Sequence, residues 1–176
     1  GLRELDRWLE DLVRAGLERL RAGRRHGVVS LSGAAGVKLA QLSAGDVGFM
    51  LGPRLNAAGR LESAEAALSL LLERDVMLAG PLEQRLDQQN RERQAITRAT
   101  QEQAAALAAG SGDGHILFAF SPEYNSGIVG LVAARLVESH YRPAVVGQIE
   151  AGTARASCRS IPEFHITHAL DRCKDL

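Results

Sequence analysis

The stretch around which the chain is organised reads Gly48-Phe49-Met50-Leu51-Gly52-Pro53-Arg54-Leu55-Asn56-Ala57-Ala58-Gly59-Arg60-Leu61. Gly52-Pro53 predicts a change of chain direction, because proline fixes φ and lacks an N–H, while glycine permits a turn that a side chain would block. Arg54, Asn56 and Arg60 then stand beside small residues that leave the backbone uncovered. Fork-shaped cationic donors beside bare backbone favour an anion, above all a phosphate.

The apolar spacing between residues 61 and 72 predicts a helix after this stretch. Asn56 and Arg60 are then expected at or near the helix N-terminus, whose dipole also favours negative charge. The alternative is structural. In that case both arginines cap carbonyls or pair with Glu62 and Glu65, and the glycines only permit close packing.

Composition indicates a globular chain with enough apolar residues for one domain or two small ones. The 176 residues are 45% apolar, and Lys+Arg balance Asp+Glu at 21 each, so any nucleic-acid-binding face must be local. Cys158 and Cys173 lie far apart without a CxxC pattern, which predicts two reduced thiols in a cytoplasmic protein. No apolar run has membrane-spanning length, so we expect no membrane partner. The absent initiator Met predicts a fragment.

Helical patterns dominate the first two thirds of the chain. Apolar residues at helical spacing over 1–22 predict an amphipathic helix or helix pair, residues 24–36 are expected to be irregular, and Ser43 is expected to cap a short helix. After a turn ending at Gly80, Pro81 is predicted to open a helix as far as Ala109. A long polar helix is typical of a connector between domains, the alternative being an arginine row that faces nucleic acid. The glycine-rich residues 110–114 predict a domain boundary.

The last third has the pattern of an α/β domain. Strands at 115–120 and 144–149 around a helix at 128–137 predict a parallel, right-handed crossover, followed by an antiparallel strand at 153–160 and a helix at 166–173. The predicted class is therefore α/β with a mixed sheet.

Two candidate phosphate sites lie in this part. Asn125, Ser126 and Gly127 form a strand-to-helix junction, where ligands of α/β sheets gather, although an ordinary tight turn would look the same. At a strand end, two hydroxyls flank a guanidinium group, a suitable cup for phosphate oxygens if the residues are not structural. These residues are Ser157, Arg159 and Ser160. His165 and His168 lack a nearby carboxylate or cysteine, so we expect no metal there.

The segment from Leu51 to Arg60 resembles the signature of the RecJ family of single-strand-specific 5′-to-3′ exonucleases, within the DHH phosphoesterase superfamily. The segments 124–130 and 157–161 resemble pieces of the family's second domain, DHHA1, with Tyr124 where the family often has a Trp that can stack on bases. The resemblance implies the helical C-terminal part of a DHH catalytic domain over 1–80, a long connecting helix over 81–110, and an incomplete DHHA1-type nucleic-acid-binding domain over 111–176.

The resemblance also implies function. The family uses Mn²⁺ or Mg²⁺, but no Asp-His-His or Asp-x-Asp occurs here, so we expect no catalytic residue or metal ligand in this chain and no activity from it alone. We expect the nine candidate residues to grip single-stranded DNA and its 5′ phosphate in a DNA repair and recombination exonuclease, a monomer that works with single-strand-binding protein and a helicase. The alternatives are a non-catalytic single-strand-binding scaffold and a DHH phosphodiesterase acting on short oligonucleotides. DNA and RNA carry the same phosphates, so both remain open as substrates.

Overall fold

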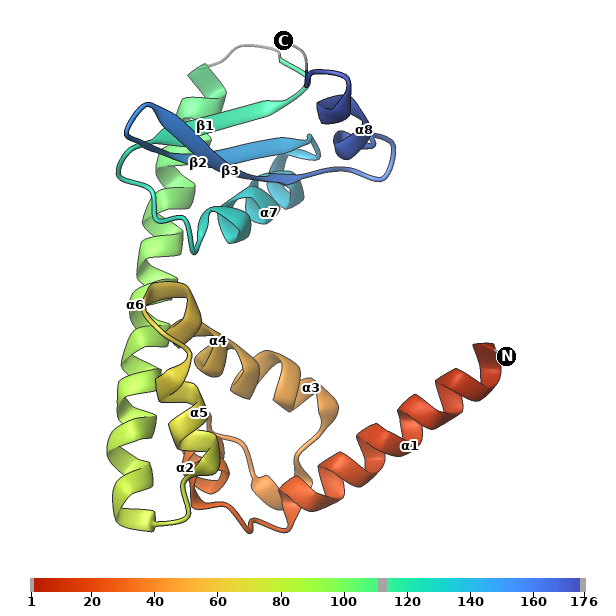
Figure 1. Ribbon diagram of the computed structural model, residues 1–176, viewed down its shortest axis with the longest axis vertical. Coiled ribbons are helices and arrows are strands. Elements are labelled where there is room, and N and C mark those ends of the chain that lie inside the picture. The colour runs from red at the N-terminus through yellow and green to blue at the C-terminus, as the bar shows by residue number, and fades with distance from the viewer. Residues whose placement is uncertain (1, 111–113, 175–176) are drawn as a thin grey trace. The chain divides into compact units, whose positions relative to one another are not determined.

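The structure is a computed structural model that describes residues 2–110 and 114–174; the core of the predicted glycine-rich boundary, residues 111–113, lies outside them. Contacts divide the chain into two compact units, Gly1–Glu92 and Arg93–Leu176, and the long helix α6 (Val76–Gly110) contributes to both. The chain is mainly helical with one small mixed sheet, which confirms the predicted class (Figure 1). Within the described part, no helix is long and apolar enough to cross a membrane.

The first unit is built from helices of different lengths around an apolar core. In order they are α1 (Leu2–Arg21), α2 (His26–Ala34), η1 (Leu39–Gln41), α3 (Ala44–Asp46), η2 (Val47–Leu51), α4 (Gly52–Leu61), α5 (Glu65–Leu72) and the first part of α6. The core side chains Leu31, Leu42, Leu70 and Leu86 are each at most 1% exposed. Ser43 caps α3 as predicted, because its hydroxyl accepts the Asp46 N–H while the Asp46 carboxylate accepts the Ser43 N–H.

Helix α2 contradicts the prediction that residues 24–36 are irregular. Its buried positions include Gly27 and Ser32 as well as Val28 and Leu31, so the apolar pattern that usually reveals a helix is interrupted. The interruption has a packing reason. A Cβ at Gly27 would lie 1.6 Å from the carbonyl oxygen of Leu70, so only glycine lets α2 approach α5 this closely.

Helix α6 begins at Val76 and not at Pro81 as predicted. The backbone carbonyl of Asp75 accepts the Ala79 N–H at 3.0 Å, and its carboxylate accepts the Met77 N–H at 2.8 Å, so Asp75 satisfies the first N–H groups. Pro81 lies in the next turn, where it forgoes one backbone hydrogen bond. The residues predicted as a turn are therefore helical.

The second unit contains the sheet. Its elements after α6 are β1 (Leu117–Ser121), α7 (Val129–His140), β2 (Ala144–Glu150), β3 (Thr153–Arg159) and α8 (Ile166–Asp171). The strand order is β1-β2-β3, with β1 parallel to β2 and β2 antiparallel to β3, as the sequence predicted. Ala119, Val146 and Ser157 stand in register across the three strands.

One face of this sheet carries the core of the second unit. Side chains of α7, such as Val132 and Leu136, pack with Ala104 and Ala108 of α6 against the strand residues that share a face with Ala119. Because side chains alternate along a strand, Ser157 and Arg159 of β3 lie on this same face. The register therefore places both residues on the face of the sheet against which α7 packs, and Figure 1 shows α7 beside the three strands.

Candidate nucleic-acid interface

The N-terminus of α7 is shaped by Asn125. Its side-chain oxygen accepts the Gly127 N–H at 2.8 Å, and its backbone carbonyl accepts the N–H groups of Ile128 and Val129 at 3.0 and 3.3 Å. An Asx turn of this kind leads the chain directly into the helix. Ser126 is exposed at the tip of the turn, and Gly127 is half-buried.

Two side chains of β3 approach the first turn of α7. A Cβ at Gly130 would lie 3.2 Å from Ser157 Oγ and 3.3 Å from Arg159 Nη2. Both groups therefore lie directly over the bare backbone of Gly130. Arg159 Nη1 donates to the carbonyl of Cys158 at 2.8 Å, which holds one edge of the guanidinium group. The fold has brought together two segments that are far apart in the sequence, and we call Ser157, Arg159 and Gly130 the α7 cup.

The cup has the chemistry of an anion site. The N-terminus of the 12-residue helix α7 carries the positive end of its dipole, and Arg159 adds a full positive charge. A hydroxyl and a guanidinium group donate hydrogen bonds that suit phosphate oxygens.

Ser160 and Tyr124 have other roles in the structure. The hydroxyl of Ser160 donates to the Phe164 carbonyl and so closes the turn after β3. Tyr124 is 2% exposed within the core of the second unit, and burial raises the pKa of its hydroxyl. A ring buried in this way is not available to stack on a base, so the stacking that the resemblance left possible at this position does not apply to Tyr124.

In the first unit, residues 47–61 form a continuous helical path. The π turn η2 ends where the Gly52 N–H donates to the Val47 carbonyl, and α4 follows at once with Pro53 in its first turn, where no N–H is needed. The predicted change of direction at Gly52-Pro53 is therefore wrong. The helical backbone continues through both residues, although Pro53 has no N–H to donate.

The placement of Asn56 and Arg60 at a helix N-terminus is wrong for the same reason. Asn56 is exposed in the middle of α4, and Arg60 is half-buried in its last turn, where the dipole is negative and favours a cation. The two residues are four apart on one helix, so their side chains are neighbours on one face.

Arg54 ties α4 to α6. Its Nε donates to Asp87 Oδ1 at 3.1 Å and its Nη1 donates to the Met50 carbonyl at 2.8 Å; the side chains of Arg54 and Asp87 are 17% and 14% exposed. Asp87 Oδ2 also accepts from Arg91 Nε at 2.8 Å. The structural alternative in the sequence analysis predicted that this arginine caps a carbonyl or pairs with Glu62 or Glu65. Arg54 does cap a carbonyl, that of Met50, but its carboxylate partner is Asp87.

The other end of α4 is held in a similar way. Glu62 Oε2 accepts from Arg85 Nη2 at 2.8 Å and from Gln89 Nε2 at 2.9 Å, both on α6. Near Asp87, Glu83 is 8% exposed, and burial, followed by the charge of Asp87, raises the pKa of its carboxyl. The face of α4 that carries Asn56 and Arg60 is thus held at both ends of the helix.

Comparison with known proteins shows what the chain is similar to. No protein-family model matches it. The single-stranded-DNA-specific exonuclease RecJ of Bacillus subtilis is 38% identical over 164 residues, or 92% of this chain, and that of Escherichia coli is 36% identical over 168 residues. A crystal structure of Thermus thermophilus RecJ with Mg²⁺ matches 96% of the chain with a TM-score of 0.83 and 31% identity. The chain is homologous to a segment of RecJ. It spans 21% of the B. subtilis protein, 29% of the E. coli protein and 26% of the Thermus chain.

The matching RecJ structures include complexes with Mg²⁺ and with Mn²⁺. Among residues 2–110 and 114–174 of this chain, no group of three or more His, Cys, Asp or Glu side chains could hold a metal ion. His165 and His168 stack with ring centroids 3.7 Å apart, and His165 Nδ1 accepts the His168 N–H at 3.3 Å, which caps α8. The described residues therefore do not fit the metal centre of RecJ.

The nine candidate residues chosen from the sequence did not include Gly130, although it ends the candidate segment 124–130, or Asp87. Gly130 carries no functional group, and its importance is visible only from the approach of β3. Asp87 forms an i, i+4 pair with Arg91, a pattern that the sequence does show, but its link to Arg54 depends on the packing of α4 against α6.

Proposed function

We propose that this RecJ homologue is the strand-gripping part of a single-strand-specific 5′-to-3′ exonuclease, and that it holds the 5′ phosphate of the DNA. The proposal rests above all on the α7 cup, where Ser157 and Arg159 reach the first turn of a helix over Gly130. A terminal phosphate carries more negative charge than an internal one, and a cup that combines a helix N-terminus with a guanidinium group prefers the more charged anion.

The residues around the cup support the same function. Asn125 and Gly127 fix the turn that begins α7, and Ser126 presents an exposed hydroxyl at its tip. Ser160 holds the chain beyond Arg159 through its bond to Phe164. We assign Ser157 and Arg159 to the phosphate and the other four residues to the turns that surround it.

In the first unit, the proposed contacts with the strand are made by α4. Asn56 and Arg60 share one face of the helix, and Arg54 fixes the helix through the bonds of its Nε and Nη1. We assign its remaining nitrogen, Nη2, to a phosphate oxygen. Residues 1–80 then correspond to the helical end of a DHH domain, 81–110 to the connecting helix and 111–176 to a DHHA1-type domain.

The Mn²⁺ or Mg²⁺ that we expect for the complete protein would have to be held by residues other than those described here. Because the described residues offer no metal cluster, we expect this chain alone to bind DNA without cleaving it. We expect the whole protein to act as a cytoplasmic monomer in DNA repair and recombination, with single-strand-binding protein and a helicase as partners.

Fluorescence anisotropy of the 176-residue chain tests the proposal, with labelled single strands that end in a 5′ phosphate or a 5′ hydroxyl. Arg159→Ala should weaken binding of the phosphorylated strand by about tenfold or more and reduce the preference for phosphate, because a charge-assisted contact is lost. Its matched control is Arg172→Ala, an exposed arginine elsewhere in this unit, which should leave the preference unchanged.

A salt series counts the phosphate contacts made by charged side chains, because each lost contact makes the slope of log affinity against log salt less steep. Arg159→Ala should reduce this slope, and Ser157→Ala should weaken binding without changing it. Equal affinity of the wild-type chain for both strand ends would refute the proposed 5′-phosphate site.

A further inference from the structure

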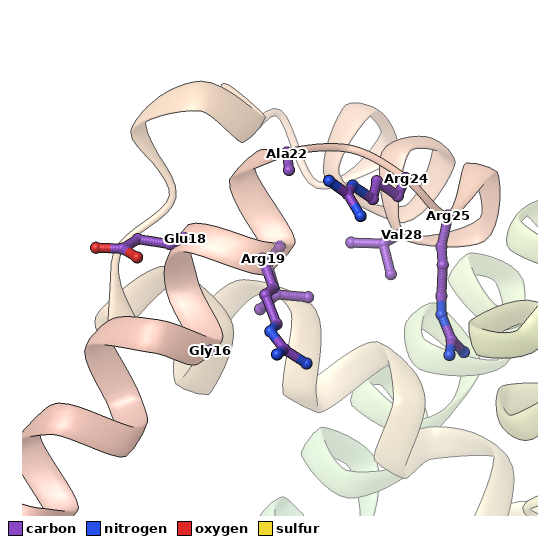
Figure 2. Close-up of a pocket in the computed structure, with 8 residues that line it drawn as sticks. Gly16, Glu18, Arg19, Ala22, Arg24, Arg25 and Val28 are labelled. Atoms are coloured by element: carbon purple, nitrogen blue, oxygen red, sulfur yellow. The ribbon is translucent and has the colours of Figure 1, made fainter.

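A cavity of about 880 Å³ opens where α1 passes into α2 in the first unit (Figure 2). Its lining comes from the last turns of α1, the connection between the helices and the start of α2. The lining residues are Gly16, Glu18, Arg19, Leu20, Ala22, Arg24, Arg25 and Val28. We call this cavity the arginine pocket.

The pocket is strongly positive. Figure 2 shows the side chains of Arg19, Arg24 and Arg25 around Val28, whereas the carboxylate of Glu18 points away from them. Arg25 donates one hydrogen bond, from Nη1 to the Leu71 carbonyl at 3.0 Å. Within the described part of the chain, neither Arg19 nor Arg24 has a hydrogen-bond or ion-pair partner. Three like charges in one concavity, two of them without a partner there, attract an anionic ligand.

The apolar part of the pocket narrows the class of ligand. Leu20, Ala22 and Val28 supply aliphatic carbon, and none of the described lining residues is aromatic. Sites for single-stranded nucleic acid combine a basic groove with aromatic rings on which the bases stack. An acidic peptide fits better, because its carboxylates match the arginines in geometry and charge while an aliphatic side chain covers the apolar carbons.

We propose that the arginine pocket binds an acidic segment of a partner protein. Carboxylates of the segment pair with Arg19 and Arg24, Arg25 adds positive charge from the rim, and one aliphatic side chain of the segment packs against Leu20 and Val28. This interaction surface is independent of the α7 cup, since its residues all belong to the first unit and the cup's residues to the second.

The test uses the full 176-residue chain and a fluorescein-labelled peptide of Asp-Asp-Leu repeats, followed by anisotropy at low salt. The double variant Arg19→Ala/Arg24→Ala should weaken binding by about tenfold or more through the loss of two charged donors. The matched control Arg7→Ala/Arg74→Ala removes two exposed arginines outside the pocket and should bind as the wild type does. A peptide of Asp-Asp-Ser repeats should bind more weakly at the same charge.

Three outcomes would overturn the proposal. The first is equal binding of the peptide by the wild type and by Arg19→Ala/Arg24→Ala. The second is equal weakening in the control variant, which would show attraction to net charge alone. The third is displacement of the peptide from the wild type by an oligothymidine, at oligothymidine concentrations at which Arg159→Ala also binds the oligothymidine. That result would assign the pocket to nucleic acid. Failure of the 5′-phosphate preference leaves all three readouts unaffected, so the two proposals are tested separately.

Discussion

Gly130→Ala tests the α7 cup without removing any functional group. The new methyl carbon would lie 3.2 Å from Ser157 Oγ, 3.3 Å from Arg159 Nη2 and 3.6 Å from Ser157 Cβ. The first two distances are shorter than the roughly 3.5–4.0 Å of an optimal non-bonded contact, so both side chains must move by a few tenths of an ångström. Both close atoms are side-chain termini, so they can move while the backbone stays in place.

The stability and the binding of this variant should change in different ways. Alanine is favoured over glycine in a helix by up to about 1 kcal/mol, which offsets the small packing penalty, so the free energy of unfolding should stay within about 1 kcal/mol of the wild type. In the cup, the methyl group covers the bare backbone of Gly130 and shifts the donors of Ser157 and Arg159. Loss of one charge-assisted hydrogen bond, about 1.5–3 kcal/mol, weakens binding of a 5′-phosphorylated strand about 10- to 150-fold.

Anisotropy and urea unfolding on the same preparations measure both effects. The matched control is Gly80→Ala, also a glycine in a helix, where an added Cβ meets nothing within 4 Å. It should keep the affinity of the wild type. A Gly130→Ala variant that unfolds like the wild type and binds the phosphorylated strand equally well would refute the reasoning that places the phosphate over Gly130.

Three further predictions concern the first unit. Asp87→Ala should lower the free energy of unfolding by about 1–3 kcal/mol in urea, because the largely buried Arg54 partner loses its carboxylate, whereas Arg85→Ala, which breaks an exposed pair, should change it by less than about 1 kcal/mol. Gly27→Ala should destabilise by more than about 3 kcal/mol in the same assay, because its Cβ would lie 1.6 Å from the Leu70 carbonyl oxygen, whereas Gly33→Ala meets nothing within 4 Å and should not. The raised pKa of Glu83 means that the folded state binds the carboxyl proton more tightly than the unfolded state does. The contribution of Glu83 to stability therefore falls as pH rises from 4.5, the ordinary pKa, through the pKa in the folded state. Glu83→Gln should raise the free energy of unfolding at neutral pH, and an equal gain below pH 4.5 would contradict this reasoning.

The second unit could be predicted closely from the sequence because its signals are local. A buried strand, a junction with Asn125 and Gly127, and a helix with regular apolar spacing each decide their own conformation, and the parallel pairing of β1 with β2 follows from the crossover. The first unit was predicted less well. Gly52-Pro53 looks like a turn when taken alone, yet the π turn before it and the tolerance of a first helical turn for proline make it a helix start.

The candidate site also combines features that local sequence signals predict with features that depend on packing. Ser157 and Arg159 were chosen for their chemistry, and their common face follows from strand periodicity, but their meeting with Gly130 depends on how α7 crosses β3, which no local pattern encodes. Arg54 was chosen for the same chemistry, and the fold gives it a carboxylate from α6 that lies 33 residues further along the chain. An arginine whose side chain is already fixed by two hydrogen bonds loses less conformational entropy on binding a phosphate than an arginine whose side chain is free to rotate. The ion pair with Asp87 thus stabilises the packing of α4, and it is compatible with the proposed contact between the remaining nitrogen of Arg54 and a phosphate.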